Sequence, residues 1–317
     1  MTPNVLIATR SFESTSPKPL EILHGAGCGL VTADMSLEMT EERLIDLLKG
    51  VAAAIVGGVP LTAHVLENAS DLKVVSAHGV GVDHIDLDAA AGLGITIANC
   101  PGANAASVAD LTFGLMIGIA RKIPGVERQL RQGGWGRHHG SELFQRTLGI
   151  IGLGHIGSGV AKRALGFDMK VLAYDPYVPR VPKELPQLKL VSLENVIRRA
   201  DFVSLHTPLN ADTRNIIGPA QLAAMKPGAY LINTARGGLV DEQALFDALD
   251  TRKIAGAALD CFANEPPTGS PLLGLDNIVM TPHIGAHTQE SIERMGVMAA
   301  QNVINVLNGL EPLNRVR

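Results

Sequence analysis

Residues 147–175 contain side chains whose types and order fit the binding of a pyrophosphate. An apolar run leads into the turn GLGHIG, an amphipathic segment follows, and a second apolar run ends at Asp175. Gly152 permits the tight turn, Gly154 lets the backbone approach the phosphates, and Gly157 lets the helix pack against the strand. The amino terminus of that helix offers free N–H groups and a partial positive charge. This order of strand, glycine turn, helix and strand predicts a dinucleotide-binding unit.

The acid at the end of the second strand bears on the choice of cofactor. The Asp175 carboxylate is expected to accept hydrogen bonds from the adenosine ribose hydroxyls and to repel a 2′-phosphate. The sequence therefore predicts NAD rather than NADP.

Polar residues also follow the strands predicted beyond this unit, at 233–238, 259–260, 264–266 and 281–286. In an open parallel sheet, ligands bind at the carboxyl ends of the strands. Arginine, carboxylate and imidazole groups at such an edge can bind anions and exchange protons. Taken singly, an arginine after a strand more often forms a surface salt bridge, and a histidine beside a proline is more often an ordinary loop residue.

The elements that must position these groups alternate between strand and helix. Before residue 100, strands are expected at 4–8, 29–33, 52–58, 72–86 (running into a glycine-rich loop) and 94–100. Thr40 and Thr62 can cap helices over 41–50 and 63–69. The alternation implies a parallel sheet covered by helices on both faces. Because this first part has no dinucleotide glycine turn, it is the candidate substrate domain.

A long apolar helix is expected from about residue 105, with a break or bend at Pro124. A polar, glycine-rich loop over 131–140 follows it. After Asp175 the alternation of strands and helices resumes. A last helix is expected over 288–308, with Gly309 as its stop and a return to the first domain.

Composition narrows the class of protein. The 317 residues are enough for two domains, and 46% hydrophobic with 18% charged residues describes a packed globule. A net charge of −4 argues against nucleic acid or membrane partners. Cys28, Cys100 and Cys261 lack metal-ligand spacing and are expected to be buried thiols in a reducing compartment. The start has no signal-peptide h-region, and no apolar run is as long as a membrane span, so a cytoplasmic location is expected.

The motifs GLGHIG, TARGGLVDE, LDCFANEPP and TPHIGAHT resemble those of the D-isomer-specific 2-hydroxyacid dehydrogenase family in order and spacing, over essentially the whole chain. The resemblance implies Arg236, Glu265 and His283 as the catalytic set. It also implies a split substrate domain and a homodimer formed through the NAD domains. We therefore expect an α/β fold of two doubly wound parallel-sheet, Rossmann-like domains. Residues 1–101 and 288–317 would form a discontinuous, flavodoxin-like substrate domain, and 102–287 the NAD-binding Rossmann domain.

In the reduction of a 2-oxo acid, the three catalytic groups would have different roles. The carbonyl oxygen needs a proton, and its developing charge needs stabilisation. His283 can supply the proton, because imidazole titrates near neutral pH. Glu265 would orient the ring and raise its pKa by favouring the charged form. Arg236 presents a planar fork of donors that matches a carboxylate and reaches the carbonyl oxygen.

The resemblance implies further contacts. Asp260 matches a position that binds the nicotinamide amide, although it could be an ordinary strand-end acid, and Thr207 could simply form a turn. The loop over 76–83 matches one whose backbone N–H groups hold the substrate carboxylate, or it is a plain glycine turn. The expected cofactor contacts are Gly152, Gly154, His155, Ile156, Gly157, Asp175, Thr207, Pro208, Thr234, Ala235, Arg236, Asp260, His283 and Gly285. The expected substrate contacts are His78, Val80, Gly81, Arg236 and His283. No metal is expected, because His138 and His139 have no third ligand placed by spacing.

The substrate stays open among small 2-hydroxy acids. Residues 134–157 are similar to phosphoglycerate dehydrogenases, which favours 3-phosphoglycerate. Ala77 stands where those enzymes often carry an arginine, no appended regulatory domain is expected, and His78 and His287 are unusual. A glyoxylate or hydroxypyruvate reductase is the first alternative. A non-catalytic NAD(H) sensor, similar to corepressors of this fold, is the second.

Overall fold

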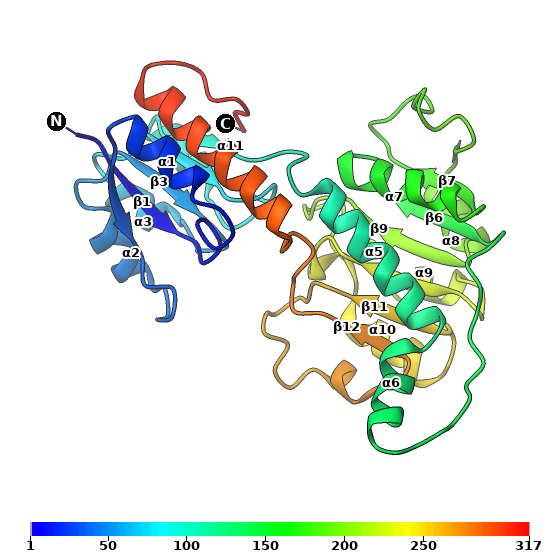
Figure 1. The fold of residues 1–317 in the computed structure, drawn as a ribbon. Coiled ribbons are helices and arrows are strands. Elements are labelled where there is room, and N and C mark those ends of the chain that lie inside the picture. Colours follow the sequence, from blue (N-terminus) through cyan, green and yellow to red (C-terminus); the bar gives the residue numbers. More distant parts are fainter. Residues whose placement is uncertain (1, 317) are drawn as a thin grey trace. The chain divides into compact units, whose positions relative to one another are not determined.

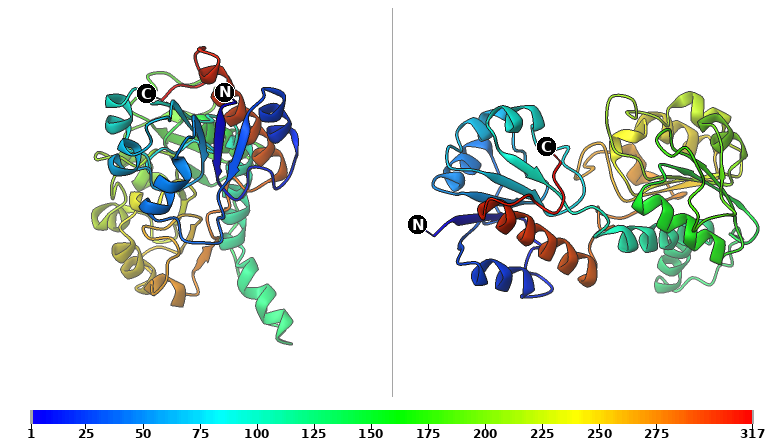
Figure 2. Two further views of the ribbon diagram at one scale, coloured as in Figure 1. Left: turned by 90° about the vertical axis from the view of Figure 1, so that its left-hand side faces the viewer. Right: turned by 90° about the horizontal axis from the view of Figure 1, so that it is seen from above.

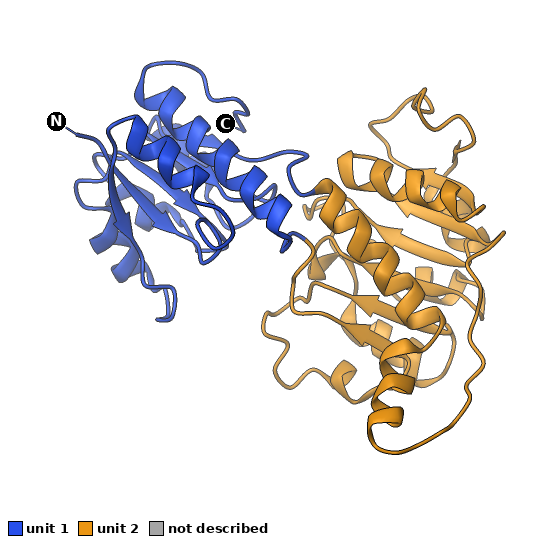
Figure 3. Cartoon of the chain, in the orientation of Figure 1, with its two compact units in different colours: residues 1–104, 286–317 blue, residues 105–285 orange. Residues whose placement is uncertain are grey.

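The computed structural model describes residues 2–316 and divides the chain into two compact units, residues 1–104 with 286–317 (unit 1) and residues 105–285 (unit 2) (Figure 3). Each unit is built on one parallel β-sheet with helices on both of its faces (Figures 1 and 2). This confirms the predicted fold class of two doubly wound α/β domains. Within the described residues, no helix is long and apolar enough to cross a membrane.

Unit 1 has a five-stranded sheet in the order β2-β1-β3-β4-β5. Its strands are β1 (Asn4–Ala8), β2 (Gly29–Thr32), β3 (Ala53–Val56), β4 (Val74–Ala77) and β5 (Thr96–Ala98). Its helices are α1 (Lys18–Gly25), α2 (Glu41–Leu48), α3 (Ala63–Glu67), α4 (Leu87–Gly92) and α11 (Gln289–Leu307). Leu6 and Ala8 of β1 face the cluster under α2, α3 and α4, whereas Val5 and Ile7 face the one under α1 and α11. Successive residues alternate between the faces of a strand, so both faces of this sheet are buried.

Helices α2 and α3 start at their predicted caps. The side chains of Thr40 and Thr62 accept hydrogen bonds from Arg43 N and Val65 N. Helices α1 and α4 were not among the expected elements. Helix α1 follows Pro17 without a side-chain cap, and the cap of α4, Asp86, which accepts a hydrogen bond from Ala89 N, was not recognised in the sequence.

Unit 2 has a seven-stranded parallel sheet in the order β12-β11-β10-β9-β6-β7-β8. Its strands are β6 (Thr147–Ile151), β7 (Lys170–Tyr174), β8 (Lys189–Leu190), β9 (Phe202–Leu205), β10 (Tyr230–Asn233), β11 (Gly256–Leu259) and β12 (Ile278–Met280). Helices α5 (Ala105–Ala120) and α7 (His155–Gly166) pack on one face. Helices α8 (Leu193–Arg199), α9 (Pro219–Ala224) and α10 (Glu242–Asp250) pack on the other.

The order in which strands are added to the sheet reverses between β6 and β9, since β7 and β8 extend the sheet on one side of β6 and β9 to β12 extend it on the other. Such a switch point opens a crevice at the carboxyl edge of a parallel sheet, where ligands bind. The turn GLGHIG follows β6 at this point, and the catalytic candidates follow β10, β11 and β12 along the same edge.

The predicted break at Pro124 is wrong in position. Helix α5 ends at Ala120, and α6 (Ile123–Arg131) begins after Lys122, whose φ of 57° turns the chain. Pro124 lies in the first turn of α6, where a missing N–H removes no helical hydrogen bond. The left-handed residue, and not the proline, therefore makes the bend.

Candidate active site

The glycine turn after β6 is held by two close backbone approaches. Gly152 has a φ of 93°, and a Cβ added there would lie 2.5 Å from the carbonyl oxygen of His206. A Cβ on Gly157 would overlap the carbonyl oxygen of Gly152, so a side chain at 157 would force α7 away from the turn. Both glycines are thus needed for the reasons predicted from the sequence.

The amino terminus of α7 is free to receive an anion. Gly154 is its N-cap, and apart from its own neighbours in the chain no heavy atom of the described residues lies within 4 Å of where a Cβ on Gly154 would stand. His155 and Ile156 begin the helix, so their backbone N–H groups have no partner within it. The turn therefore fits a dinucleotide pyrophosphate.

Asp175 is fixed against this turn. Its Oδ2 accepts a hydrogen bond from Leu153 N at 2.7 Å, and its Oδ1 accepts one from Tyr177 N at 2.9 Å. Because Leu153 lies inside GLGHIG, the carboxylate stands directly beside the proposed phosphate site. The contact of Asp175 with the adenosine ribose stays a prediction.

The loop after β10 carries Arg236 and is held by a fully buried amide. Asn233 Oδ1 accepts a hydrogen bond from Ala235 N at 3.0 Å, and its Nδ2 donates to the carbonyl oxygen of Arg236 at 2.8 Å. Thr234 is buried, with its hydroxyl 2.9 Å from that of Thr112 on α5. Arg236 Nη1 donates to the carbonyl oxygen of Ala235 at 2.8 Å. These bonds fix the backbone at this edge.

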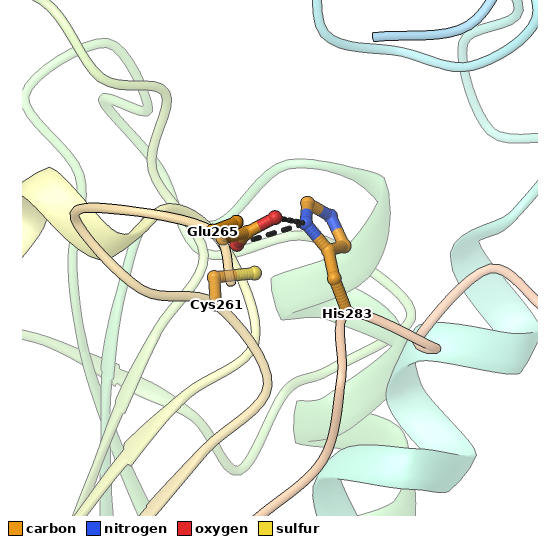
Figure 4. A group of neighbouring side chains, drawn as sticks. All are labelled: Cys261, Glu265 and His283. Carbon is orange, nitrogen blue, oxygen red and sulfur yellow. Dashed lines mark hydrogen bonds and ion pairs between the residues drawn. The ribbon is translucent and has the colours of Figure 1, made fainter. Parts of the chain in front are cut away.

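The structure brings Glu265 and His283 into direct contact (Figure 4). Nδ1 of His283 lies 2.8 Å from Oε2 and 3.1 Å from Oε1 of Glu265. Glu265 Oε1 also accepts a hydrogen bond from Phe262 N at 3.0 Å, which fixes the carboxylate. With Nδ1 engaged by the carboxylate, Nε2 is the imidazole nitrogen left to meet a substrate.

Glu265 and His283 each stabilise the charged form of the other and so shift each other's pKa. Hydrogen bonding with Cys261 and with Glu265 outweighs burial and raises the pKa of His283 from 6.5 to about 10. Burial opposes ionisation of Glu265, but its hydrogen bonds to His283 and Phe262 and the nearby charges of His283 and Arg236 lower its pKa overall. At neutral pH the pair is therefore imidazolium and carboxylate, with a guanidinium near enough to influence it.

Asp260 holds the loop that carries His283. Its Oδ1 accepts hydrogen bonds from Thr281 Oγ1 at 2.6 Å and Ile284 N at 2.8 Å, and its Oδ2 accepts one from Gly285 N at 2.8 Å. The residue is 1% exposed. Sequence reasoning missed this positioning role, and the implied contact of Asp260 with the nicotinamide amide stays a prediction.

Cys261 is a second neighbour that sequence reasoning missed. It is buried directly after Asp260, and its Sγ lies 3.4 Å from the carbonyl oxygen of Ala235. The thiol, the carboxylate of Glu265 and the imidazole of His283 all lie within 4.8 Å of one another (Figure 4). The only signal in the sequence was the position of this cysteine, directly after the strand-end acid.

Thr207, Pro208 and the substrate candidates of unit 1 stay predictions. Thr207 and Pro208 follow β9, beside the glycine turn. The ring of His78, after β4, is buried against Phe12 with its Nδ1 3.3 Å from Ser11 Oγ, and burial lowers its pKa to about 4. Asn99 Nδ2 donates to the carbonyl oxygen of Val80 at 2.8 Å and fixes the loop that contains Gly81.

Comparison with known proteins shows the family to which the chain is similar. The family model "D-isomer specific 2-hydroxyacid dehydrogenase, NAD binding domain" matches residues 113–285. The chain is 45% identical over 280 residues to a D-3-phosphoglycerate dehydrogenase of Methanocaldococcus jannaschii, covering 87% of this chain and 53% of that protein. It is 41% identical over 278 residues to a hydroxypyruvate reductase of Thermotoga maritima, covering 86% and 90%.

A solved structure shows the same fold. The crystal structure of D-lactate dehydrogenase from Aquifex aeolicus, complexed with NAD and lactic acid, has a TM-score of 0.86 and 31% identity, covering 99% of this chain and 98% of that one. The chain spans about half the length of the phosphoglycerate dehydrogenases that it matches. With the family model covering more than half of the sequence, the chain belongs to the D-isomer specific 2-hydroxyacid dehydrogenase family, and its NAD-binding domain makes NAD the cofactor.

Proposed function

We propose that the protein is an NAD-dependent D-2-hydroxyacid dehydrogenase that interconverts a small 2-oxo acid and its 2-hydroxy acid. The observation that carries the proposal is the Glu265–His283 pair near Arg236, on the sheet edge of the unit that carries GLGHIG. Bound NADH would supply the hydride. The protein must then supply a proton and an anion site, and these residues have the chemistry for both.

In reduction, His283 donates a proton from Nε2 to the carbonyl oxygen of the substrate. Glu265 keeps the ring oriented through Nδ1 and stabilises its charged form. Arg236 binds the substrate carboxylate and stabilises the negative charge that develops on the carbonyl oxygen. In the opposite direction, neutral His283 accepts the hydroxyl proton. A pKa of about 10 keeps the free protein in the acid form at neutral pH, which is the form that reduction requires.

We propose 3-phosphoglycerate and its 2-oxo product as the favoured substrate pair, because the stretch over 134–157 and the relative named D-3-phosphoglycerate dehydrogenase both support it. Glyoxylate and hydroxypyruvate form the alternative, supported by the relative named hydroxypyruvate reductase. An assay of NADH consumption with phosphohydroxypyruvate, hydroxypyruvate, glyoxylate and pyruvate tests both. The fastest substrate by kcat/KM decides between them. If NADH binds but no substrate is turned over, the protein is a sensor and the enzymatic proposal is wrong.

We expect Asp175→Ala to narrow the preference for NADH over NADPH. The variant loses both an acceptor for the ribose hydroxyls and the charge that repels a 2′-phosphate. The ratio of kcat/KM values for the two cofactors should fall by about tenfold or more, since hydrogen bonds to charged groups contribute about 1.5–3 kcal/mol. Asp276→Ala is the matched control, because that exposed acid pairs with Arg252 before β12, at the opposite edge of the sheet. An unchanged preference in Asp175→Ala would remove Asp175 from the ribose site.

We expect Glu265→Gln to move the basic limb of the reduction pH profile to lower pH. The rate requires protonated His283, so kcat/KM falls as the pH rises through the pKa of His283. The amide keeps the shape of the carboxylate but removes its charge, which should lower that pKa by about 1 unit or more. Glu242→Gln is the control, because Glu242 Oε1 accepts a hydrogen bond from Ala263 N in the same loop. If the basic limb of the kcat/KM profile lies at the wild-type pH in both variants, Glu265 does not set the pKa of His283.

We also propose a homodimer formed through the NAD-binding unit. Four large apolar side chains of its 121–146 segment are exposed: Ile123 by 46%, Leu130 by 56%, Trp135 by 79% and Phe144 by 54%. Exposed apolar surface of this kind often marks a protein interface. The cytoplasmic location expected from the sequence stays a prediction.

A further inference from the structure

The catalytic pair has a third ligand-type side chain beside it. Sγ of Cys261, a carboxylate oxygen of Glu265 and a ring nitrogen of His283 all lie within 4.8 Å of one another (Figure 4). No other cluster of three such groups occurs within residues 2–316. In the proposed reaction the imidazole exchanges the proton and the carboxylate orients it, whereas the thiol contacts neither the substrate nor the cofactor and acts only through its hydrogen bonding with His283.

These three groups match one class of cation. Zinc binds thiolate sulfur at about 2.3 Å and imidazole nitrogen or carboxylate oxygen at about 2.0–2.2 Å, so its ligands lie within about 4 Å of one another. The ligand atoms are at most 4.8 Å apart, so movements of about 1 Å bring them to the separations that zinc requires. A sulfur ligand selects zinc and cadmium over magnesium and calcium, which prefer oxygen. Three protein ligands leave one position of a tetrahedral site open.

The backbone already holds the ligands in place. Asp260 N donates to the carbonyl oxygen of Asn233 at 2.8 Å, so Cys261 starts from a fixed strand end. The Asp260 carboxylate fixes the loop of His283, and Phe262 N fixes the carboxylate of Glu265. The side chains of His283 and Glu265 are 46% and 38% exposed, so a cation can reach them from solvent.

We propose that Cys261, Glu265 and His283 bind a thiophilic divalent cation, Zn²⁺ or Cd²⁺, and that the bound cation blocks proton donation by His283. Binding releases two protons, one from the thiol and one from the imidazolium, while the carboxylate binds as it stands. The cation then occupies the position of the proton shared by Glu265 and His283. The site does not depend on the proposed activity. Only the inhibition rests on it.

Direct binding tests the site without any assay of activity. Untagged, chelator-treated protein is titrated with CdCl₂ and ZnCl₂, and calorimetry is combined with the ultraviolet absorption of the cadmium–thiolate bond. We expect one equivalent of Cd²⁺ to bind with a thiolate band. Cys261→Val should lose the band and bind about 100-fold more weakly or worse, since even partners behind the ligands contribute 10–100-fold to affinity.

Control variants and NADH binding distinguish the loss of a metal ligand from a loss of folding. Cys28→Ser, at a partly exposed thiol in unit 1, should keep both the band and the affinity. Cys261→Ser keeps nearly the volume of the thiol and should also lose the band, and NADH binding by each variant shows whether unit 2 is folded. A thiolate band in Cys261→Val, or equal affinity in wild type and both Cys261 variants, would overturn the proposal.

Inhibition is measured with the best substrate of the NADH assay. Zn²⁺ should inhibit wild type and Cys28→Ser, and a chelator should restore the rate. Cys261→Val should need at least about tenfold more Zn²⁺ for the same inhibition, since about tenfold is the lower limit even for a partner behind the ligands. Cation binding without turnover of any substrate by the metal-free protein would contradict the proposed function alone. Turnover without cation binding would contradict the cation site alone.

Discussion

Replacement of His283 with alanine is expected to lower kcat for reduction by about 10²–10⁴-fold, the usual range for loss of a general acid. The variant removes the proton donor that Glu265 orients and whose pKa is raised to about 10. NADH affinity should change little, because the pyrophosphate site lies at the amino terminus of α7 and not at the loop after β12. Steady-state rates and a fluorescence titration of NADH measure the two quantities separately.

His139→Ala is the matched control, since His139 is an exposed histidine in the loop between α6 and β6. It should keep the wild-type kcat. Added imidazole should restore part of the rate of His283→Ala, because a free base can occupy the vacated position and carry the proton. A near-normal kcat in His283→Ala would rule out this histidine as the proton donor.

The second large effect is expected for Arg236→Lys, with kcat/KM lower by about 10²–10³-fold, the range seen when a donor to a developing oxyanion is lost. Lysine keeps the positive charge and therefore the electrostatic influence on Glu265. It loses the planar fork that matches a carboxylate at two points. A large loss in this variant would thus report geometry and not charge.

Arg252→Lys is the control for that substitution, because Arg252 forms an exposed ion pair with Asp276 away from the carboxyl edge of the sheet. Its kinetics should match wild type. Both kcat and KM of Arg236→Lys should change, since the guanidinium serves the substrate carboxylate and the transition state. A kcat/KM within threefold of wild type would mean that Arg236 does not contact the substrate.

Much of the fold could be predicted because local signals agree with it. The apolar runs gave the long strands, and Thr40, Thr62 and Thr288 start their helices by accepting backbone N–H groups. The exceptions are local as well. The bend before α6 depends on the left-handed backbone of Lys122. This conformation is uncommon for lysine, so the sequence does not indicate it.

The sequence predicted which loops lie at the carboxyl edge of the sheet, because each of them follows a predicted strand. Parallel strands bring the loops of Arg236, Glu265 and His283 to one edge, so their meeting follows from the sheet. The side-chain packing inside those loops cannot be derived from the order of the strands. His283 has a φ of 53°, and Asp260 turns inward to hold its loop. The same loop packing brings the thiol of Cys261 beside the pair.

The most direct test of the proposed reaction follows the hydride itself. The protein is incubated with the best of its 2-oxo acids whose reduction creates a stereocentre at C2, which excludes glyoxylate, and with NADH deuterated at C4, using each C4 diastereomer in turn. Proton NMR and chiral chromatography then identify the product. We predict a D-2-hydroxy acid that carries deuterium at C2 with one of the two diastereomers. An L product, or a product without deuterium from either diastereomer, would contradict hydride transfer by a D-2-hydroxyacid dehydrogenase.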